Sequence, residues 1–150
     1  MITKLRHGTL QDAPAIAEIL SNWIDETDWM PRIHSYDEDR GFGAFLVEKT
    51  QVIVAESGAS IVGFLALRDA NIQALYLRPV ARNLGLGKSL LDHVKSSHNI
   101  LTLWAFQENL AARRFYAREG FREVEMTDGN GNDEKLPDVR LVWQRETSNG

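Results

Sequence analysis

The chain has 150 residues, of which 43% are hydrophobic and 25% charged, and these values predict a single domain, residues 1–150, with a core of its own. A formal net charge of −4 argues against a nucleic-acid-binding protein, and the lack of cysteine excludes disulfides, cysteine-ligated metals and a cysteine nucleophile. No apolar run has the length of a secretory signal or a membrane span, so we expect a cytoplasmic enzyme.

The N-terminal region predicts a strand followed by an amphipathic helix. Residues Ile2–Arg6 alternate between apolar and polar side chains, which is typical of a strand. Thr9 and Asp12 have the spacing of a helix capping box, with Asp in place of the usual Glu or Gln. Apolar residues at helical spacing follow as far as Ile24.

A second helix and a hairpin are expected next. Ser35 and Glu38 form another capping-box pattern, which predicts a helix that continues to about Glu48. The apolar stretches 51–56 and 61–67 are separated by a short Gly-containing turn, and this arrangement is typical of a β-hairpin.

The second half of the chain alternates between strands and helices. The polar stretch 127–135 contains two turn signals and predicts a loop, and residues 146–150 are expected to have no regular structure. The resulting element order, β-α-α-β-β-β-α-β-α-β-β, predicts an α/β protein with a mixed sheet and helices on its faces. The expected elements are strand 72–77, a helix from the glycines to about 96, strand 100–106, helix 109–119, and strands 121–126 and 139–144.

The segment between strand 72–77 and the next helix has the features of an anion site. Gly85 and Gly87 precede the helix, and its first turn offers unpaired N–H groups and a partial positive charge. A Walker A loop would require glycine where Arg82 stands, and a dinucleotide-binding loop would require it at Leu90. Both nucleotide patterns therefore fail, although glycines required only for the turn remain an alternative.

The pattern that does fit is Arg82-x-x-Gly85-x-Gly87, which resembles the acyl-CoA diphosphate loop of the GNAT superfamily of N-acetyltransferases. A second stretch, Asn109-x-x-Ala112-x-x-x-Tyr116 followed by Gly-Phe, resembles that family's other signature. Seven residues separate the Asn from the Tyr, so both lie on one helix face, about 10 Å apart. The alternatives are that Tyr116 only packs in the core and that Asn109 only caps the helix.

The resemblance implies a GNAT-like acyl-CoA N-acyltransferase fold with strands splayed at the cofactor site, and acetyl-CoA as the cofactor. It implies that the Asn holds the pantetheine arm and that a branched side chain at position 87 would project where the phosphates approach. The expected cofactor-binding residues are Tyr76, Leu77, Arg82, Asn83, Leu84, Gly85, Leu86, Gly87, Lys88, Ser89, Asn109, Ala112, Arg113 and Tyr116.

The family transfers an acetyl group from acetyl-CoA directly to an amine. The resemblance implies a bulge near the end of strand 72–77 that frees the backbone N–H of Leu77 for the developing oxyanion. The leaving thiolate departs as the anion or takes a proton from Tyr116. Many relatives carry a Glu near the position of Gln73, which cannot accept a proton. His34 and an ordered water relay are therefore the two candidates for the base.

The acceptor site is expected between residues 25–35 and 127–138. An aromatic and acidic pocket there would suit a cationic primary amine of a small molecule or peptide, although a solvated acidic helix end is the alternative. The expected substrate-binding residues are Glu26, Trp29, Met30 and Gln73, with Trp23, Asp28 and Tyr36 near them. No metal is expected. The acceptor, the acyl length and the oligomeric state, a homodimer included, stay open.

Two other functions compete with the transferase. An acyl-CoA-binding sensor without chemistry is favoured only by Gln73, and Tyr116 argues against it. A nucleotide-phosphate enzyme would use the Gly-Lys-Ser stretch at 87–89, and the Arg at position 82 argues against that.

Overall fold

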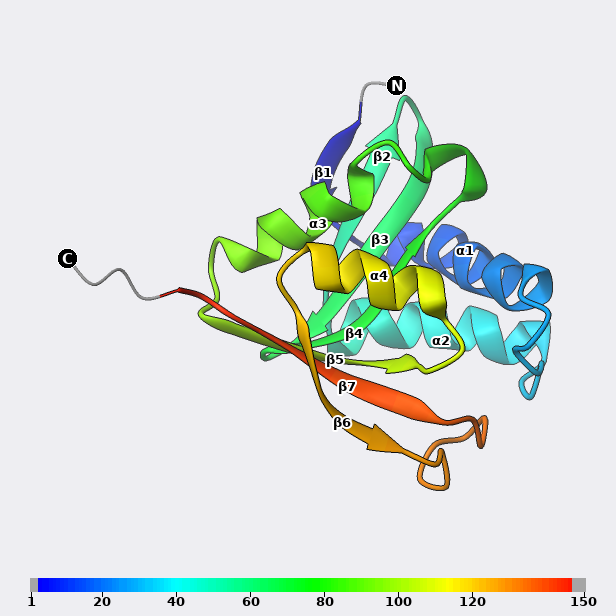
Figure 1. The fold of residues 1–150 in the computed structure, drawn as a ribbon. Helices are drawn as coiled ribbons and strands as arrows, with labels where there is room; N and C mark the ends of the chain where they lie inside the picture. Colours follow the sequence, from blue (N-terminus) through cyan, green and yellow to red (C-terminus); the bar gives the residue numbers. More distant parts are fainter. Residues whose placement is uncertain (1–2, 147–150) are drawn as a thin grey trace.

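The structure is a computed structural model that describes residues 3–146, and its centre is a seven-stranded mixed sheet (Figure 1). The strand order is β1-β2-β3-β4-β5-β7-β6, and only the β4–β5 pair is parallel. The elements are β1 (Lys4–His7), a 3₁₀ turn (Leu10–Asp12), α1 (Ala13–Glu26), α2 (Tyr36–Lys49), β2 (Gln51–Ser57), β3 (Ser60–Arg68), β4 (Asn71–Leu77), a second 3₁₀ turn (Pro79–Ala81), α3 (Leu86–Lys95), β5 (Ile100–Phe106), α4 (Leu110–Arg118), β6 (Arg122–Thr127) and β7 (Asp138–Gln144).

The observed element order confirms the expected mixed α/β architecture. Boundaries agree closely, because the helix caps are local signals: the Ser35 hydroxyl accepts the Glu38 N–H at 3.1 Å, and the Glu38 carboxylate accepts the Ser35 N–H at 3.0 Å. Ile2 and residues 147–150 lie outside the described residues. Among residues 3–146, no helix is long and apolar enough to cross a membrane.

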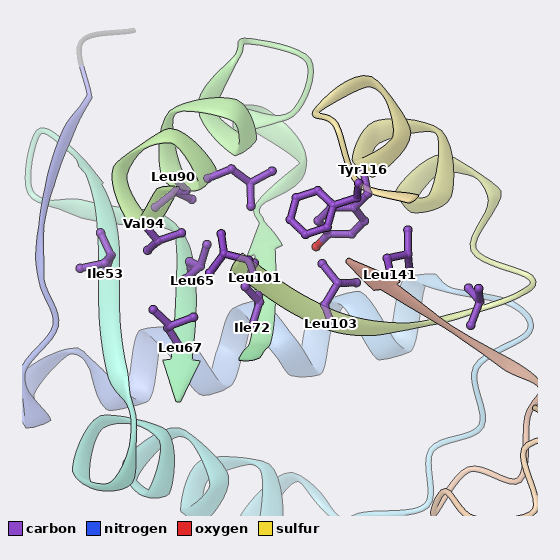
Figure 2. Close-up of a cluster of buried hydrophobic side chains, with 13 residues drawn as sticks. Ile53, Leu65, Leu67, Ile72, Leu90, Val94, Leu101, Leu103, Tyr116 and Leu141 are labelled. Atoms are coloured by element: carbon purple, nitrogen blue, oxygen red, sulfur yellow. The ribbon is translucent and has the colours of Figure 1, made fainter. Parts of the chain in front are cut away.

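Helices cover both faces of the sheet (Figure 1). On one face, Ile16 and Ile19 of α1 and Leu46 of α2 pack against the buried side chains of β2 and β3. On the other face, Leu90 of α3 and Tyr116 of α4 join a larger cluster over β3, β5 and β7. Figure 2 shows the Tyr116 ring reaching from α4 into this cluster, beside Leu103.

The sheet opens between its two parallel strands. The β4–β5 pairing holds only at Asn71 and Thr102, at the start of β4, and beyond it the strands part. The expected bulge lies elsewhere than predicted: the β3–β4 register shifts so that Gln73 has no opposite residue, near the beginning of β4 rather than its end. One extra residue on β4 there bends that strand and increases its twist.

Candidate active site

A cleft of about 740 Å³ opens where β4 and β5 separate, between the start of α3 and the length of α4. Its lining includes the segment with Gly85 and Gly87, where the backbone is accessible, together with apolar and basic side chains. All but three of the expected cofactor-binding residues line it: Tyr76, Leu77, Arg82, Asn83, Gly85, Leu86, Gly87, Lys88, Asn109, Ala112 and Tyr116.

The glycine segment forms the N-terminus of α3. Gly85 is the N-cap residue, with a φ of +79° that favours glycine. The N–H groups that follow the cap have no partner inside the helix until Ser89, which donates to the Gly85 carbonyl at 3.1 Å. The first turn of α3 therefore presents unpaired donors and the positive end of the helix dipole, a combination that suits a diphosphate.

Arg82 connects this segment to β4 and α1. Its Nε donates to the Leu77 carbonyl at 3.1 Å, and its guanidinium pairs with Glu26. Glu26, expected to bind the acceptor, thus lies against the cofactor loop because it neutralises Arg82 from the end of α1. About a third of each of these two side chains is exposed, so the pair is open to competition from an incoming anion.

One face of α4 forms the opposite wall of the cleft. The Asn109 side chain caps the helix by accepting the Ala112 N–H at 3.1 Å, and both residues line the cleft with Tyr116. Arg113 lies elsewhere than expected, because its guanidinium forms two hydrogen bonds of 2.8 Å with Glu123 of β6.

The backbone N–H of Leu77 faces the gap between the parted strands. Arg78 donates its N–H to the Val62 carbonyl at 2.8 Å. That bond makes Leu77 and Gly63, which are opposite in the register, a non-hydrogen-bonded pair. The Leu77 N–H is therefore directed away from β3 and toward the side on which β5 has separated, where it is placed to donate to an oxyanion.

Two phenols line the cleft, that of Tyr116, which is buried, and that of Tyr76, which is half-buried. Tyr116 is 7% exposed, and burial raises its pKa well above the ordinary value, with a smaller contribution from Tyr76. Burial likewise raises the pKa of Tyr76 to about 12, with a smaller contribution from Glu134. Both hydroxyls therefore stay protonated at neutral pH and can only donate a proton.

A second pocket, of about 590 Å³, lies between α1, α2 and the β6–β7 loop. Met30, His34 and Gln73 line it, as expected for an acceptor site. Trp29 does not, because its ring packs against Trp23 and Phe106, with centroid distances of 5.9 and 5.8 Å. His34 Nδ1 lies 3.2 Å from a Glu38 oxygen at the exposed rim, so the histidine belongs to this pocket and not to the cleft beside Tyr116.

The two cavities share Trp23 and Tyr76 as a common wall. A smaller space of about 90 Å³ is lined by residues of both cavities, with Tyr116 from the cleft and Gln73 from the second pocket among them. A long ligand in the first cleft and an amine in the second pocket would thus meet where the strands part.

The model of the acetyltransferase (GNAT) domain matches residues 48–123, from the end of α2 to the start of β6. The chain belongs to the GNAT family of acetyltransferases. It is an acetyl-CoA-dependent N-acetyltransferase, and its acceptor is an amine.

Relatives of this GNAT chain cover nearly its whole length. Peptidyl-lysine N-acetyltransferase YiaC of Escherichia coli is 27% identical over 146 residues, which cover 93% of this chain and 95% of that protein. Peptidyl-lysine N-acetyltransferase YjaB of the same species is 24% identical over 144 residues, covering 95% and 98%.

Solved structures show the same GNAT fold. The solution structure of apo YjaB from Escherichia coli superimposes with a TM-score of 0.80 at 21% identity, covering 97% of this chain and all of that one. The structure of yncA from Salmonella typhimurium with its cofactor acetyl-CoA has a TM-score of 0.73 at 18% identity, covering 100% and 98%.

Two further expected cofactor residues lie outside the cleft of the GNAT chain. Leu84 and Ser89, both exposed at the start of α3, line a separate pocket with Ala81. The backbone of this segment still borders the cleft through its neighbours Asn83 and Gly85.

Sequence reasoning missed several charged residues of the two cavities, among them two arginines and two carboxylates. Arg114 and Arg118 line the cofactor cleft, and their spacing of four residues on α4 could have revealed a shared face. Asp133 and Glu134 line the acceptor pocket from a loop whose conformation no periodicity describes. In the part of the chain from 3 to 146, no group of three potential ligand side chains is arranged to hold a metal ion.

Proposed function

We propose that the acceptor of this acetyltransferase is the side-chain amine of a lysine in a peptide or protein segment. The observation that carries the proposal is the second pocket, which meets the cofactor cleft at Tyr76 and has aromatic walls and an acidic rim. Aromatic faces and carboxylates suit a protonated amine on an apolar stem. Two relatives that cover nearly the whole chain carry the name peptidyl-lysine N-acetyltransferase, which supports the same acceptor.

The residues that line the cleft come from β4, the start of α3 and α4, and together they fit acetyl-CoA. We propose that the N–H groups at the start of α3 bind the diphosphate, with Arg82 and Lys88 as charge partners. Asn109 and Ala112 then border the pantetheine arm, since they lie on the face of α4 that leads to Tyr116. The bound thioester supplies the activated acetyl group.

The chemistry assigned to this chain is positioning and proton transfer. The Leu77 N–H donates to the oxyanion that forms when the amine attacks the thioester carbonyl. As the C–N bond forms and the C–S bond breaks, Tyr116 is placed to give its proton to the departing sulfur. The nitrogen releases its second proton to water, from which Tyr116 is reprotonated. The ammonium loses its proton before attack, and His34 at the rim of the acceptor pocket and a water relay remain the two candidate bases.

The experiment is acceptor profiling with acetyl-CoA and the intact chain. Free-thiol release is measured with lysine peptides, peptides whose only amine is the α-amine, and small diamines, and mass spectrometry locates the added acetyl group. We expect acetylation at Nε of lysine. Exclusive acetylation of α-amines or of diamines would contradict the proposed acceptor while leaving the acetyltransferase activity intact.

A further inference from the structure

The loop between β6 and β7 is held in one conformation by side-chain hydrogen bonds. Gln107, beyond the end of β5, donates its Nε2 to the Thr127 and Asp138 carbonyls, both at 3.0 Å. Asn132 donates Nδ2 to the Leu136 carbonyl at 2.8 Å, and its Oδ1 accepts the Leu136 N–H at 3.3 Å. These bonds join both ends of the loop to β5 and brace its tip, so its side chains have defined positions.

The braced tip presents two carboxylates to the acceptor pocket. Asp133 and Glu134 both line this pocket, and Glu134 is the more buried of the two. The Glu134 carboxylate lies close enough to Tyr76 to contribute to the raised pKa of that phenol, after burial. Because Tyr76 is also a wall of the cofactor cleft, Glu134 stands at the inner part of the acceptor pocket.

Two of the other carboxylates of the pocket are already engaged, and the remaining one, Asp133, is exposed. Asp39 accepts from Arg32 at 2.6 Å, and Glu38 accepts the Ser35 N–H and lies beside His34. Within residues 3–146, Glu134 forms neither an ion pair nor a side-chain hydrogen bond in this structure. It is thus a half-buried carboxylate beside the aromatic walls of the pocket, and a carboxylate in that setting suits a cationic partner.

We propose that Glu134 binds the protonated amine of the acceptor and thereby makes this acetyltransferase selective for cationic acceptors. The proposal rests on the proposed function, since it takes the second pocket as the acceptor site. Glu134 supplies from the β6–β7 loop the negative charge that uncharged Gln73 cannot supply from β4. The role of Glu134 is to hold the amine next to Tyr76. The α2 residues that line the pocket would then pack against the apolar stem of the acceptor's lysine side chain.

The test compares Glu134→Gln with the matched variant Glu125→Gln, an exposed glutamate on β6 outside both cavities. With a lysine peptide, Glu134→Gln should raise the KM for the peptide about tenfold, because a hydrogen bond to a charged group is lost. The KM for acetyl-CoA should stay unchanged, Glu134→Asp should recover part of the peptide affinity, and Glu125→Gln should behave as the parent.

A peptide with norleucine in place of lysine isolates the charge. As a competitive inhibitor it should bind the parent and Glu134→Gln equally, because it has no ammonium to lose. Three results would overturn the proposal. They are an equal loss of affinity of Glu134→Gln for both peptides, an unchanged KM of Glu134→Gln for the lysine peptide, and a raised KM in Asp133→Asn but not in Glu134→Gln. If the parent chain acetylates no peptide, the proposed acceptor fails, and the same KM comparison on whichever primary amine it accepts still tests Glu134.

Discussion

The backbone of Gly87 lies against the ring of Phe115. A β-carbon at position 87 would stand 3.1 Å from the Cζ atom and 3.4 Å from the Cε1 atom of that ring. This contact joins the first turn of α3 to α4 and sets the width of the cofactor cleft, which both residues line. It corrects the expectation that a side chain at position 87 would project toward the phosphates, because the ring occupies that direction.

Gly87→Val should therefore act by pushing the two helices apart. We expect a loss of about 1–3 kcal/mol in the free energy of unfolding, typical of overpacking, together with weaker CoA binding. Thermal denaturation and calorimetric titration with CoA measure the two effects. Gly41→Ala is the control, since a β-carbon at that position of α2 meets nothing within 4 Å, and it should stabilise the chain by about 0.5–1 kcal/mol. Equal stability of Gly87→Val and the parent would disprove this packing role.

Arg114 and Arg118 should contribute long-range attraction for the cofactor. Both line the cleft, and neither has a carboxylate partner in the described part of the chain, whereas Lys88 pairs with Asp92 at 2.8 Å. Replacing both arginines with Gln should weaken CoA binding about tenfold at low salt and by less at high salt, because exposed charges are screened. Calorimetry at two ionic strengths measures this, and Arg122→Gln on β6 is the control. A salt dependence identical to that of the parent would exclude the proposed role.

Asp12 should make stability depend on pH at the entrance to α1. Arg6 donates to both of its carboxylate oxygens, at 2.8 and 2.9 Å, and this lowers the pKa of Asp12 against the opposing effect of burial. A lowered folded-state pKa means that the stabilisation is present above the unfolded value, about 3.9, and is lost as the pH falls through the folded value.

Asp12→Asn should thus cost about 1–3 kcal/mol at pH 7, with a difference from the parent that shrinks below about pH 4. Urea denaturation across this pH range measures the effect. Asp28→Asn is the control, because Asp28 is exposed and has no ion pair among residues 3–146. A constant difference at all pH values would show that Asp12 contributes through packing rather than charge.

Most of the fold followed from local signals. Capping residues, apolar periodicity and turn residues act within a few positions, so the order and bounds of the elements agree with the expectations. The splayed strands came from the family resemblance, but the bulge was misplaced by several residues. Strand register depends on side-chain packing between distant segments, which a single sequence does not display.

In the candidate site too, residues placed by local sequence were predicted, and residues placed by tertiary contacts were missed. The glycine segment and the Asn109–Tyr116 face were predicted because each lies within one short stretch. Arg113 was assigned to the cleft in place of its neighbour Arg114, since a shift of one residue rotates a side chain by about 100° around the helix, and only tertiary contacts fix that rotation. Glu134 reaches the acceptor pocket through a braced loop, so no sequence pattern places it there.

Tyr116→Phe should separate chemistry from binding. The centroid of the Tyr116 ring lies 5.3 Å from that of Phe121 and 5.1 Å from that of Phe115. Because phenylalanine keeps these contacts, the affinity for acetyl-CoA and the free energy of unfolding should change little. Loss of the proton donor should lower kcat about 100-fold. Because burial raises the pKa of Tyr116, the parent should keep its activity to a pH above the ordinary tyrosine value, about 10, for as long as the fold persists.

Tyr76→Phe is the matched control, because Tyr76 is a second phenol of raised pKa in the same cleft. Stopped-flow thiol release under saturating acetyl-CoA compares kcat for the two variants. If Tyr76→Phe loses more activity than Tyr116→Phe, the proton comes from the phenol shared by both cavities. If both variants keep the parent kcat, the sulfur departs as the thiolate, stabilised by the positive end of α3 and the arginines of the cleft rather than by a tyrosine.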